Sequence, residues 1–156
     1  MEQVAVRGVA HNGNVAKVSL VGVQDRPGVA ARIFETLAAH SVNILLIVQA
    51  EHHEGHNDIS FLIGADMISH VRADLDRLRA EVGARELIVG QNVGTVSVVG
   101  EGVQRETGIA ARMFAALSRE NINIDLISTS NLMITCVVDG NQLESAVRVV
   151  HAEFLE

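Results

Sequence analysis

The chain has no tryptophan and no tyrosine, and only one cysteine and one proline among its 156 residues. Its formal net charge is −7. It therefore lacks the basic surface and stacking aromatic residues typical of nucleic-acid-binding proteins, and we expect no nucleic-acid partner. A single cysteine excludes an internal disulfide framework and a four-cysteine zinc site. That residue, Cys136, lies in the apolar run Met133–Val138, which predicts a small buried core residue.

Long hydrophobic runs are also missing. No apolar segment approaches the roughly 20 residues that a membrane-spanning helix needs. The first residues, Met1-Glu2-Gln3-Val4, lack the basic and apolar regions of a secretion signal. We therefore expect a cytoplasmic protein with no membrane partner. Apolar residues make up 48% of the chain, which predicts a packed globule with apolar surface left to bury against a partner.

What the sequence does contain is an internal repeat. Three segments of the first half return in the second half: Asn14–Gly22 as Asn92–Gly100, Gly28–Phe34 as Gly108–Phe114, and Val42-Asn43-Ile44 as Ile122-Asn123-Ile124. The offset is 78 residues for the first segment and 80 for the second. A period of this length exceeds that of helical solenoids and propeller blades, and it indicates two copies of one small domain. Two such domains facing each other across a pseudo-twofold axis would form pockets where they meet.

The first copy predicts six elements from its apolar periodicity and turn residues. They are a strand at Val18–Val23, a helix at Val29–His40, strands at Ile44–Val48 and Asp58–Ile63, a helix at Ile68–Val82 and a strand at Glu86–Val89. The continuous apolar run Ile44–Val48 indicates a strand buried on both faces. Asp25 is a candidate cap for the first helix, with Pro27 in its first turn. The order β-α-β-β-α-β predicts an α+β, ferredoxin-like fold, in which two helices cover one face of an antiparallel sheet.

The second copy repeats this order but ends one strand short. Its expected elements are strands at Val96–Val99, Ile124–Ser128 and Met133–Val138, with helices at Ile109–Arg119 and Leu143–Phe154. The segment Val4–Val9 precedes the first copy and belongs to no element there, so we expect it to fill the empty strand position. The first domain, residues 15–90, would then be inserted in a second domain made of residues 1–14 and 91–156.

A histidine-rich stretch is the one candidate metal site. Its possible ligands are His52, His53, His56 and Asp58. A metal site needs three or four ligands at fixed geometry, with hydrogen-bond partners that orient them. The other interpretation is a polar hairpin between two strands. We favour the hairpin and expect no metal and no cofactor.

Several of these segments resemble a known family. The turn Asp25-x-Pro27-Gly28, the helix after it and the pair Asn43-Ile44 resemble the ACT domain, a small-molecule-binding module of amino-acid metabolism. In the second copy, Asn121–Ser130 (NINIDLISTS) and Val149–Leu155 (VVHAEFL) are similar to the corresponding segments of aspartate kinase. The paired Ala-Ala-Arg-x-Phe helices are similar as well. The resemblance extends over essentially the whole chain and implies paired ACT domains.

The resemblance also implies a function without catalysis. The nucleotide motifs of that family's kinase domain do not occur here, nor does a G-x-x-x-x-G-K-[ST] phosphate loop. The chain would be the regulatory subunit or regulatory region of an aspartate kinase, with activity residing in a separate catalytic part. It would bind threonine or lysine for feedback inhibition of aspartate-family amino-acid biosynthesis. We expect a homodimer that buries the apolar strands Ile44–Val48 and Ile124–Ser128.

An amino-acid effector presents a carboxylate and an ammonium group. The helix N-terminus at Val29 and Ala30 offers backbone N–H groups for the carboxylate, and Gly28 allows close approach. Asp25 is the candidate partner of the ammonium group, and Gln49 of a side-chain hydroxyl or amine. The resemblance adds Asn123 and Ile124 from a facing second domain. The alternatives are a helix cap for Asp25, a solvated strand end for Gln49 and a turn residue for Asn123.

A second, pseudo-symmetric site would combine Gly108, Ile109 and Ala110 with Asn43, Ile44 and Ser130. Here Arg105-Glu106-Thr107-Gly108 replaces the Pro-Gly turn, so this site is expected to be altered or empty. Ala50, where an Asn commonly follows the Gln, and Asn131-Leu132 also depart from the family's pattern. These departures affect the choice of effector rather than the fold.

Three classes of function remain open from the sequence. The first is the aspartate kinase regulatory part, and the second is a stand-alone tandem ACT sensor that regulates another enzyme. The third is an enzyme that uses the His52–His56 loop. The segment Asn121–Ser130 and the expected N-terminal strand favour the first class. Threonine and lysine share their carboxylate and ammonium groups, so the effector cannot be chosen from these residues.

Overall fold

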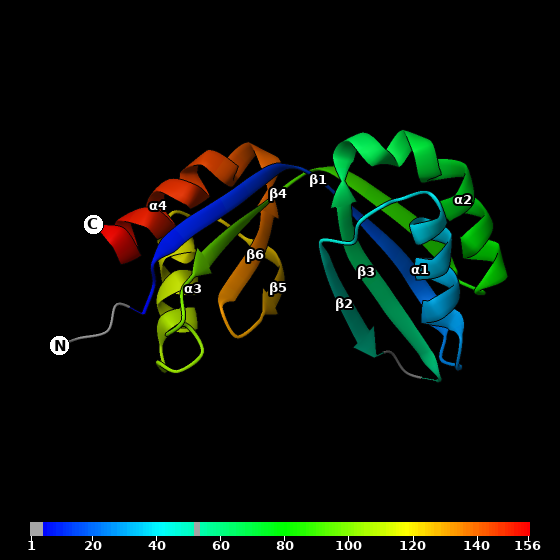
Figure 1. The fold of residues 1–156 in the computed structure, drawn as a ribbon, viewed down its shortest axis with the longest axis horizontal. Helices are drawn as coiled ribbons and strands as arrows, with labels where there is room; N and C mark the ends of the chain where they lie inside the picture. Colours follow the sequence, from blue (N-terminus) through cyan, green and yellow to red (C-terminus); the bar gives the residue numbers. More distant parts are fainter. Residues whose placement is uncertain (1–4, 52–53) are drawn as a thin grey trace. The chain divides into compact units, whose positions relative to one another are not determined.

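The computed structural model describes residues 5–51 and 54–156, and it divides into two compact units (Figure 1). We call Asn14–Gln91 the inserted unit. The split unit consists of Asn92–Glu156 together with the N-terminal segment that ends at Gly13.

The elements follow one another as the repeat predicts. They are β1 (Gly8–Gln24), α1 (Val29–Ala39), β2 (Leu46–Glu51), β3 (His56–Gly64), the short 3-10 turn η1 (Ala65–Met67), α2 (Ile68–Glu81), β4 (Glu86–Val99), α3 (Ile109–Arg119), β5 (Ile124–Thr129), β6 (Met133–Asp139), the 3-10 turn η2 (Gly140–Gln142) and α4 (Leu143–Leu155). The hydrogen-bonded strand order is β2-β3-β1-β4-β6-β5. The inserted unit has the order β-α-β-β-α-β, and the split unit has the same elements with its last strand supplied by the N-terminal part of β1, so the predicted fold class is confirmed.

Pairing in the inserted unit places β3 between β1 and β2, antiparallel to both. Phe61 lies opposite Val18 on one side and Ile47 on the other. The register of β1 shifts between Leu20 and Val23. Gly22 lies at this irregularity with φ 70°, and its N–H donates to Asp58 Oδ1 at 2.9 Å. A bulge at this point ends the regular ladder shortly before the chain turns into α1.

The fourth strand of the split unit comes from the N-terminal segment. Arg7 N donates to Val99 O at 2.7 Å, and Arg85 N donates to Val21 O at 2.8 Å in the inserted unit. Because Val21 and Val99 are repeat-related, Arg7 occupies in one unit the position of Arg85 in the other. The N-terminal segment therefore pairs where the sequence predicted an empty strand position. Val4, the first residue of the predicted strand, lies outside the described residues.

Two predicted breaks between strands do not exist. The sequence suggested separate strands at Val4–Val9 and Val18–Val23, and at Glu86–Val89 and Val96–Val99. The structure instead has one strand from Gly8 to Gln24 and one from Glu86 to Val99. Neither intervening segment contains proline. Extended backbone paired with a neighbouring strand can continue through glycine and asparagine, although these residues are uncommon in strands.

A separate core fills each unit. In the inserted unit, Val71, Leu75, Leu78 and Val82 of the predicted helix face are all buried, beside Phe61. In the split unit, α3 and α4 pack on β4 and β6 through residues that include Met113 and Val150. Cys136 is fully buried there, as predicted, and its burial raises the pKa of the thiol to about 12.

The strand expected to be buried on both faces is only half-buried. In β2, and in the residues just before it, burial alternates, with Leu45 50% and Ile47 51% exposed. The β2 strand has one hydrogen-bonded neighbour in the strand order, so it is an edge strand. One face packs on the core and the other is left uncovered, which is the pattern of an antiparallel sheet with helices on one side. Within residues 5–51 and 54–156, no helix is long and apolar enough to cross a membrane.

Candidate functional site

The helix α1 begins at a glycine in the left-handed region. Gly28 is the N-cap residue with φ 91°, and no side chain caps the helix. The prediction that Asp25 caps α1 is therefore wrong, and Pro27 precedes the N-cap instead of lying in the first turn. An N-cap without a side-chain acceptor leaves the first N–H groups of the helix available to a bound anion.

A hollow of about 250 Å³ adjoins this helix end. It is lined by Arg26, Pro27, Gly28, Val29, Arg32, Glu81 and Val82. Two of these side chains are guanidinium groups and one, Glu81, is a carboxylate, so the hollow combines the positive end of a helix with a net positive charge. Arg32 Nε lies 2.8 Å from Glu81 Oε2 at the end of α2, which orients this guanidinium. The chemistry of the hollow suits a carboxylate.

The other predicted residues of the first site lie around this hollow rather than in its lining. Asp25 is exposed, and its backbone N–H donates to Gly55 O at 2.8 Å. Ala30, in the first turn of α1, is exposed. Gln49 is exposed on β2, opposite Ile59 in the register. Leu45, Ile47 and Gln49 are alternate residues and all are exposed, so their side chains project from the same uncovered face of the strand.

The split unit repeats the helix start. Gly108 is the N-cap of α3 with φ 99°, again without a side-chain cap. Ile109 is buried and Ala110 half-buried directly after it. Ser130, the remaining polar candidate, follows β5 and donates its backbone N–H to Met133 O at 2.8 Å. The changed turn Arg105–Gly108 therefore keeps the backbone geometry that an anion would use.

The two Asn-Ile pairs also have matching surroundings. Asn43 and Asn123 are exposed, and Ile44 and Ile124 are half-buried after them. The residues two positions before the asparagines, Ser41 and Asn121, have φ 58° and 56°. Asparagine is enriched in this left-handed region, and serine adopts it less readily. The repeat thus preserves a specific backbone turn ahead of each pair, which the sequence patterns did not reveal.

Asn123 and Ile124 border a second hollow, of about 340 Å³, within the split unit. Its other lining residues are Phe114, Ser118, Asn121 and Ile122. The structure thus places the two halves of the predicted first site in hollows of two different units: Gly28 and Val29 in one, and Asn123 and Ile124 in the other.

Sequence reasoning assigned no role to the two arginines of the repeated Ala-Ala-Arg-x-Phe helices. Arg32 binds Glu81, and Arg112 Nε binds Glu153 Oε1 at 2.9 Å. The one sequence signal for a role of these residues was that arginine recurs at the same position of both copies. Their acidic partners follow no constant offset, so the sequence alone did not identify the pairs.

Only two of the four candidate metal ligands lie among the described residues. His52 and His53 lie outside the described residues. His56 is half-buried in β3, and Asp58 accepts the hydrogen bond from Gly22 N. Among residues 5–51 and 54–156, no group of three or more histidine, cysteine or acidic side chains could hold a metal ion.

Comparison with known proteins identifies the domains. Two models of the ACT domain match this chain, one over residues 11–80 and the other over residues 96–154. The aspartate kinase of Stutzerimonas stutzeri is 40% identical over 99% of this chain, and the aspartokinase of Pseudomonas aeruginosa is 39% identical over the same share. In both comparisons the chain spans 37% of the relative's length.

A solved structure matches from end to end. The ligand-free regulatory subunit of aspartate kinase from Thermus thermophilus is 31% identical, with a TM-score of 0.89 over 96% of this chain and 99% of that chain. A chain of a crystal structure of aspartokinase alpha and beta subunits is 33% identical, with a TM-score of 0.87 over 96% of this chain and 98% of that chain.

Proposed function

Since the chain belongs to the aspartate kinase family, as its regulatory part with two ACT domains in tandem, we propose that it binds an end-product amino acid of the aspartate pathway. Threonine is the first candidate and lysine the second. Binding would shift an associated catalytic part toward an inactive state, which is feedback inhibition. The observation that carries this proposal is the Gly28 helix start, which has no side-chain cap and lies beside the guanidinium groups of Arg26 and Arg32.

Each group of threonine has a proposed partner. The carboxylate would lie at the N-terminus of α1, near the N–H groups of Val29 and Ala30. Asp25 would accept from the ammonium group, and Gln49 would bond the hydroxyl. The exposed side chains of Asp25 and Gln49 support this assignment, because neither is used in the core.

We propose that a second chain completes the site. In a homodimer, the inserted unit of one chain would face the split unit of its partner, whose main chain at Asn123 and Ile124 would bond the effector. The hollow around this pair supports the proposal, since it leaves room beside the backbone. The pseudo-symmetric site would use Gly108, Ile109 and Ala110 with Asn43, Ile44 and Ser130, and we propose a weaker effector affinity there.

The chain would act without catalysing phosphorylation itself, in the cytoplasm, and with a catalytic kinase subunit or domain as its partner. The solved complex of aspartokinase alpha and beta subunits supports such a division. Incubation of the purified chain with ATP and aspartate should give no aspartyl phosphate. Formation of product by a preparation free of other kinases would contradict this part of the proposal.

The effector is tested by calorimetric titration of the chain with threonine, lysine, methionine and the branched-chain amino acids. We expect threonine to bind most tightly of these amino acids. No heat with threonine or lysine, from a chain shown to be folded, would refute the proposal.

Two variants, each altering one half of the proposed effector site, test whether the site is built from two chains. Asp25→Ala removes the ammonium partner, and Asn123→Trp places an indole beside the proposed ligand. Each homodimer should bind threonine at least about tenfold more weakly than the unchanged chain. After unfolding and refolding as a mixture, the heterodimer should regain one intact site. Absence of any recovery, although mass spectrometry shows the heterodimer, would contradict a site built from two chains.

A further inference from the structure

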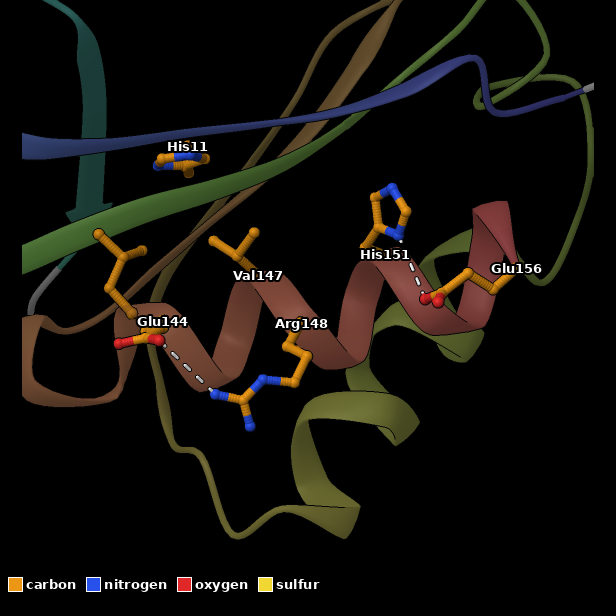
Figure 2. Close-up of a pocket in the computed structure, with 7 residues that line it drawn as sticks. His11, Glu144, Val147, Arg148, His151 and Glu156 are labelled. Carbon is orange, nitrogen blue, oxygen red and sulfur yellow. Dashed lines mark hydrogen bonds and ion pairs between the residues drawn. The ribbon is translucent and has the colours of Figure 1, made fainter.

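A third hollow lies on the face of α4 and shares no lining residue with the hollow at the Gly28 helix start (Figure 2). It measures about 520 Å³ and lies within the split unit, between α4 and the β1 residue His11. Binding pockets for small molecules typically enclose about 300 to 1,000 Å³. The effector site proposed above uses none of its residues.

The repeat shows what normally occupies this position. Since Arg7 corresponds to Arg85, His11 corresponds to Val89 four residues further along the strand. Val89 packs against the core of the inserted unit, whereas His11 is exposed. The split unit therefore has an imidazole at the position where the inserted unit has a packed aliphatic side chain, and the hollow lies beside that imidazole.

The floor of the hollow is apolar and held in place. Leu143 and Val147 line it and are half-buried on α4. A Cβ added to Gly94 would lie 2.7 Å from Leu143 Cδ2, so this leucine packs directly on the backbone of β4. Leu143 and Val147 pack against the core and keep part of their aliphatic surface exposed, which offers a surface for an aliphatic group.

Charged groups of both signs surround this floor. Arg148 lies 3.9 Å from Glu144, and His151 Nδ1 lies 3.2 Å from Glu156 Oε2. Figure 2 shows both pairs along α4, with Val147 and His151 on the side toward β1. The side chains of both pairs are about half exposed or more. Exposed pairs of this kind contribute little to stability, so a ligand can replace either partner at small cost.

We propose that this hollow binds a free α-amino acid with a branched aliphatic side chain, such as leucine. The side chain would lie on Leu143 and Val147. Its carboxylate would bond Arg148, and its ammonium group would bond a carboxylate of the rim, Glu144 or Glu156. The two glutamates disfavour phosphate and other polyanions. Within residues 5–51 and 54–156, no group of side chains fits a metal ion.

The test follows backbone amide signals by NMR during titration of the full chain with leucine. Signals of residues 143–151 and of His11 should shift and saturate. Leucinamide, which lacks the carboxylate, and 4-methylpentanoate, which lacks the ammonium group, should each bind about tenfold more weakly or worse. Equal shifts with 4-methylpentanoate would overturn the assignment of an amino acid, and no shift on α4 would overturn the site.

Two variants locate the binding. His11→Val introduces the residue that the inserted unit has at the corresponding position, Val89. This variant should abolish the leucine shifts while the fold is kept. Arg148→Gln changes an exposed side chain and should weaken leucine by about tenfold or more. Asp25→Ala is the matched control, because it alters only the proposed effector site and should leave the α4 shifts intact. Unchanged leucine affinity in Arg148→Gln, or loss of the α4 shifts in Asp25→Ala, would overturn the proposal.

Discussion

Arg112 and Glu153 join the two helices of the split unit by an ion pair, with Nε 2.9 Å from Oε1. The guanidinium also donates to Glu153 O at 3.0 Å and lies 4.6 Å above the centre of the Phe154 ring. Arg32 and Glu81 make the corresponding pair in the inserted unit at 2.8 Å. Each unit thus fixes the helix that begins at its left-handed glycine to the second helix. This pairing sets where the uncapped helix N-terminus lies.

The Arg112–Glu153 pair predicts a dependence of stability on pH. The hydrogen bond from Arg112 lowers the pKa of the Glu153 carboxyl below its ordinary value of 4.5. A lowered pKa in the folded state stabilises the protein above the ordinary value, and this contribution is lost as pH falls through the folded-state pKa. Glu153→Gln should therefore lower the free energy of unfolding at pH 7, by ~1 kcal/mol or less for such an exposed pair.

Urea denaturation from neutral pH to about pH 3 measures this effect. The difference between Glu153→Gln and the unchanged chain should shrink toward zero at acidic pH. Glu144→Gln is the control, because Glu144 is 95% exposed and lies 3.9 Å from Arg148, so its curve should follow the unchanged chain. A difference that stays constant with pH would show that the charge of Glu153 does not contribute.

Gly100 should be essential for docking of the N-terminal segment. A Cβ at this position would collide with Ala5 O and come within 3.0 Å of Arg7 N, and both are rigid backbone atoms. Gly100→Ala should destabilise the protein by about 1–3 kcal/mol, the usual cost of overpacking. Gly90→Ala, within the strand β4 that ends just before Gly100, places its Cβ in open space and is the matched control. Equal unfolding midpoints for the two variants would contradict the described docking.

The exposed isoleucines of the two edge strands predict a dimer. Ile47 on β2 is 51% exposed and Ile127 on β5 is 45% exposed. A lysine at either position would place a charge in the buried contact, so Ile47→Lys and Ile127→Lys should shift the chain toward monomer. Ile88→Lys is the control, since Ile88 is 47% exposed but lies on β4, outside the two strands proposed to meet in the dimer.

Light scattering checks this prediction. The unchanged chain and Ile88→Lys should have twice the mass of the 16.7 kDa monomer at micromolar concentration. A mass of 16.7 kDa for the unchanged chain, with and without threonine, would contradict the dimer.

The repeat made most of the fold predictable, because it identified each helix and strand twice. Local patterns failed where a residue's partner lies far away in the sequence. Ile47 looked buried because an apolar run does not reveal that helices cover only one face of its sheet. Asp25 looked like a cap because its spacing fits, but the left-handed φ of Gly28 starts the helix later.

The candidate site was predictable only in its backbone features. The glycines at 28 and 108 were visible in the repeat, and both begin helices as the sequence indicated. The partners of Arg32 and Arg112 were not visible, since they depend on how two helices pack. Nor did any pattern indicate the left-handed turn at Asn121, which precedes the Asn-Ile pair.

The central claim is that Asp25 and Gln49 bind an amino-acid effector beside the Gly28 helix start. Calorimetric titration of threonine into Asp25→Ala, Gln49→Ala and the unchanged chain tests it most directly. Loss of one charge-assisted hydrogen bond costs about 1.5–3 kcal/mol. Asp25→Ala should therefore bind threonine about 10- to 150-fold more weakly, with little change in folding, because Asp25 is exposed and does not cap the helix. Unchanged threonine affinity in both variants, with the dimer still folded, would contradict the account.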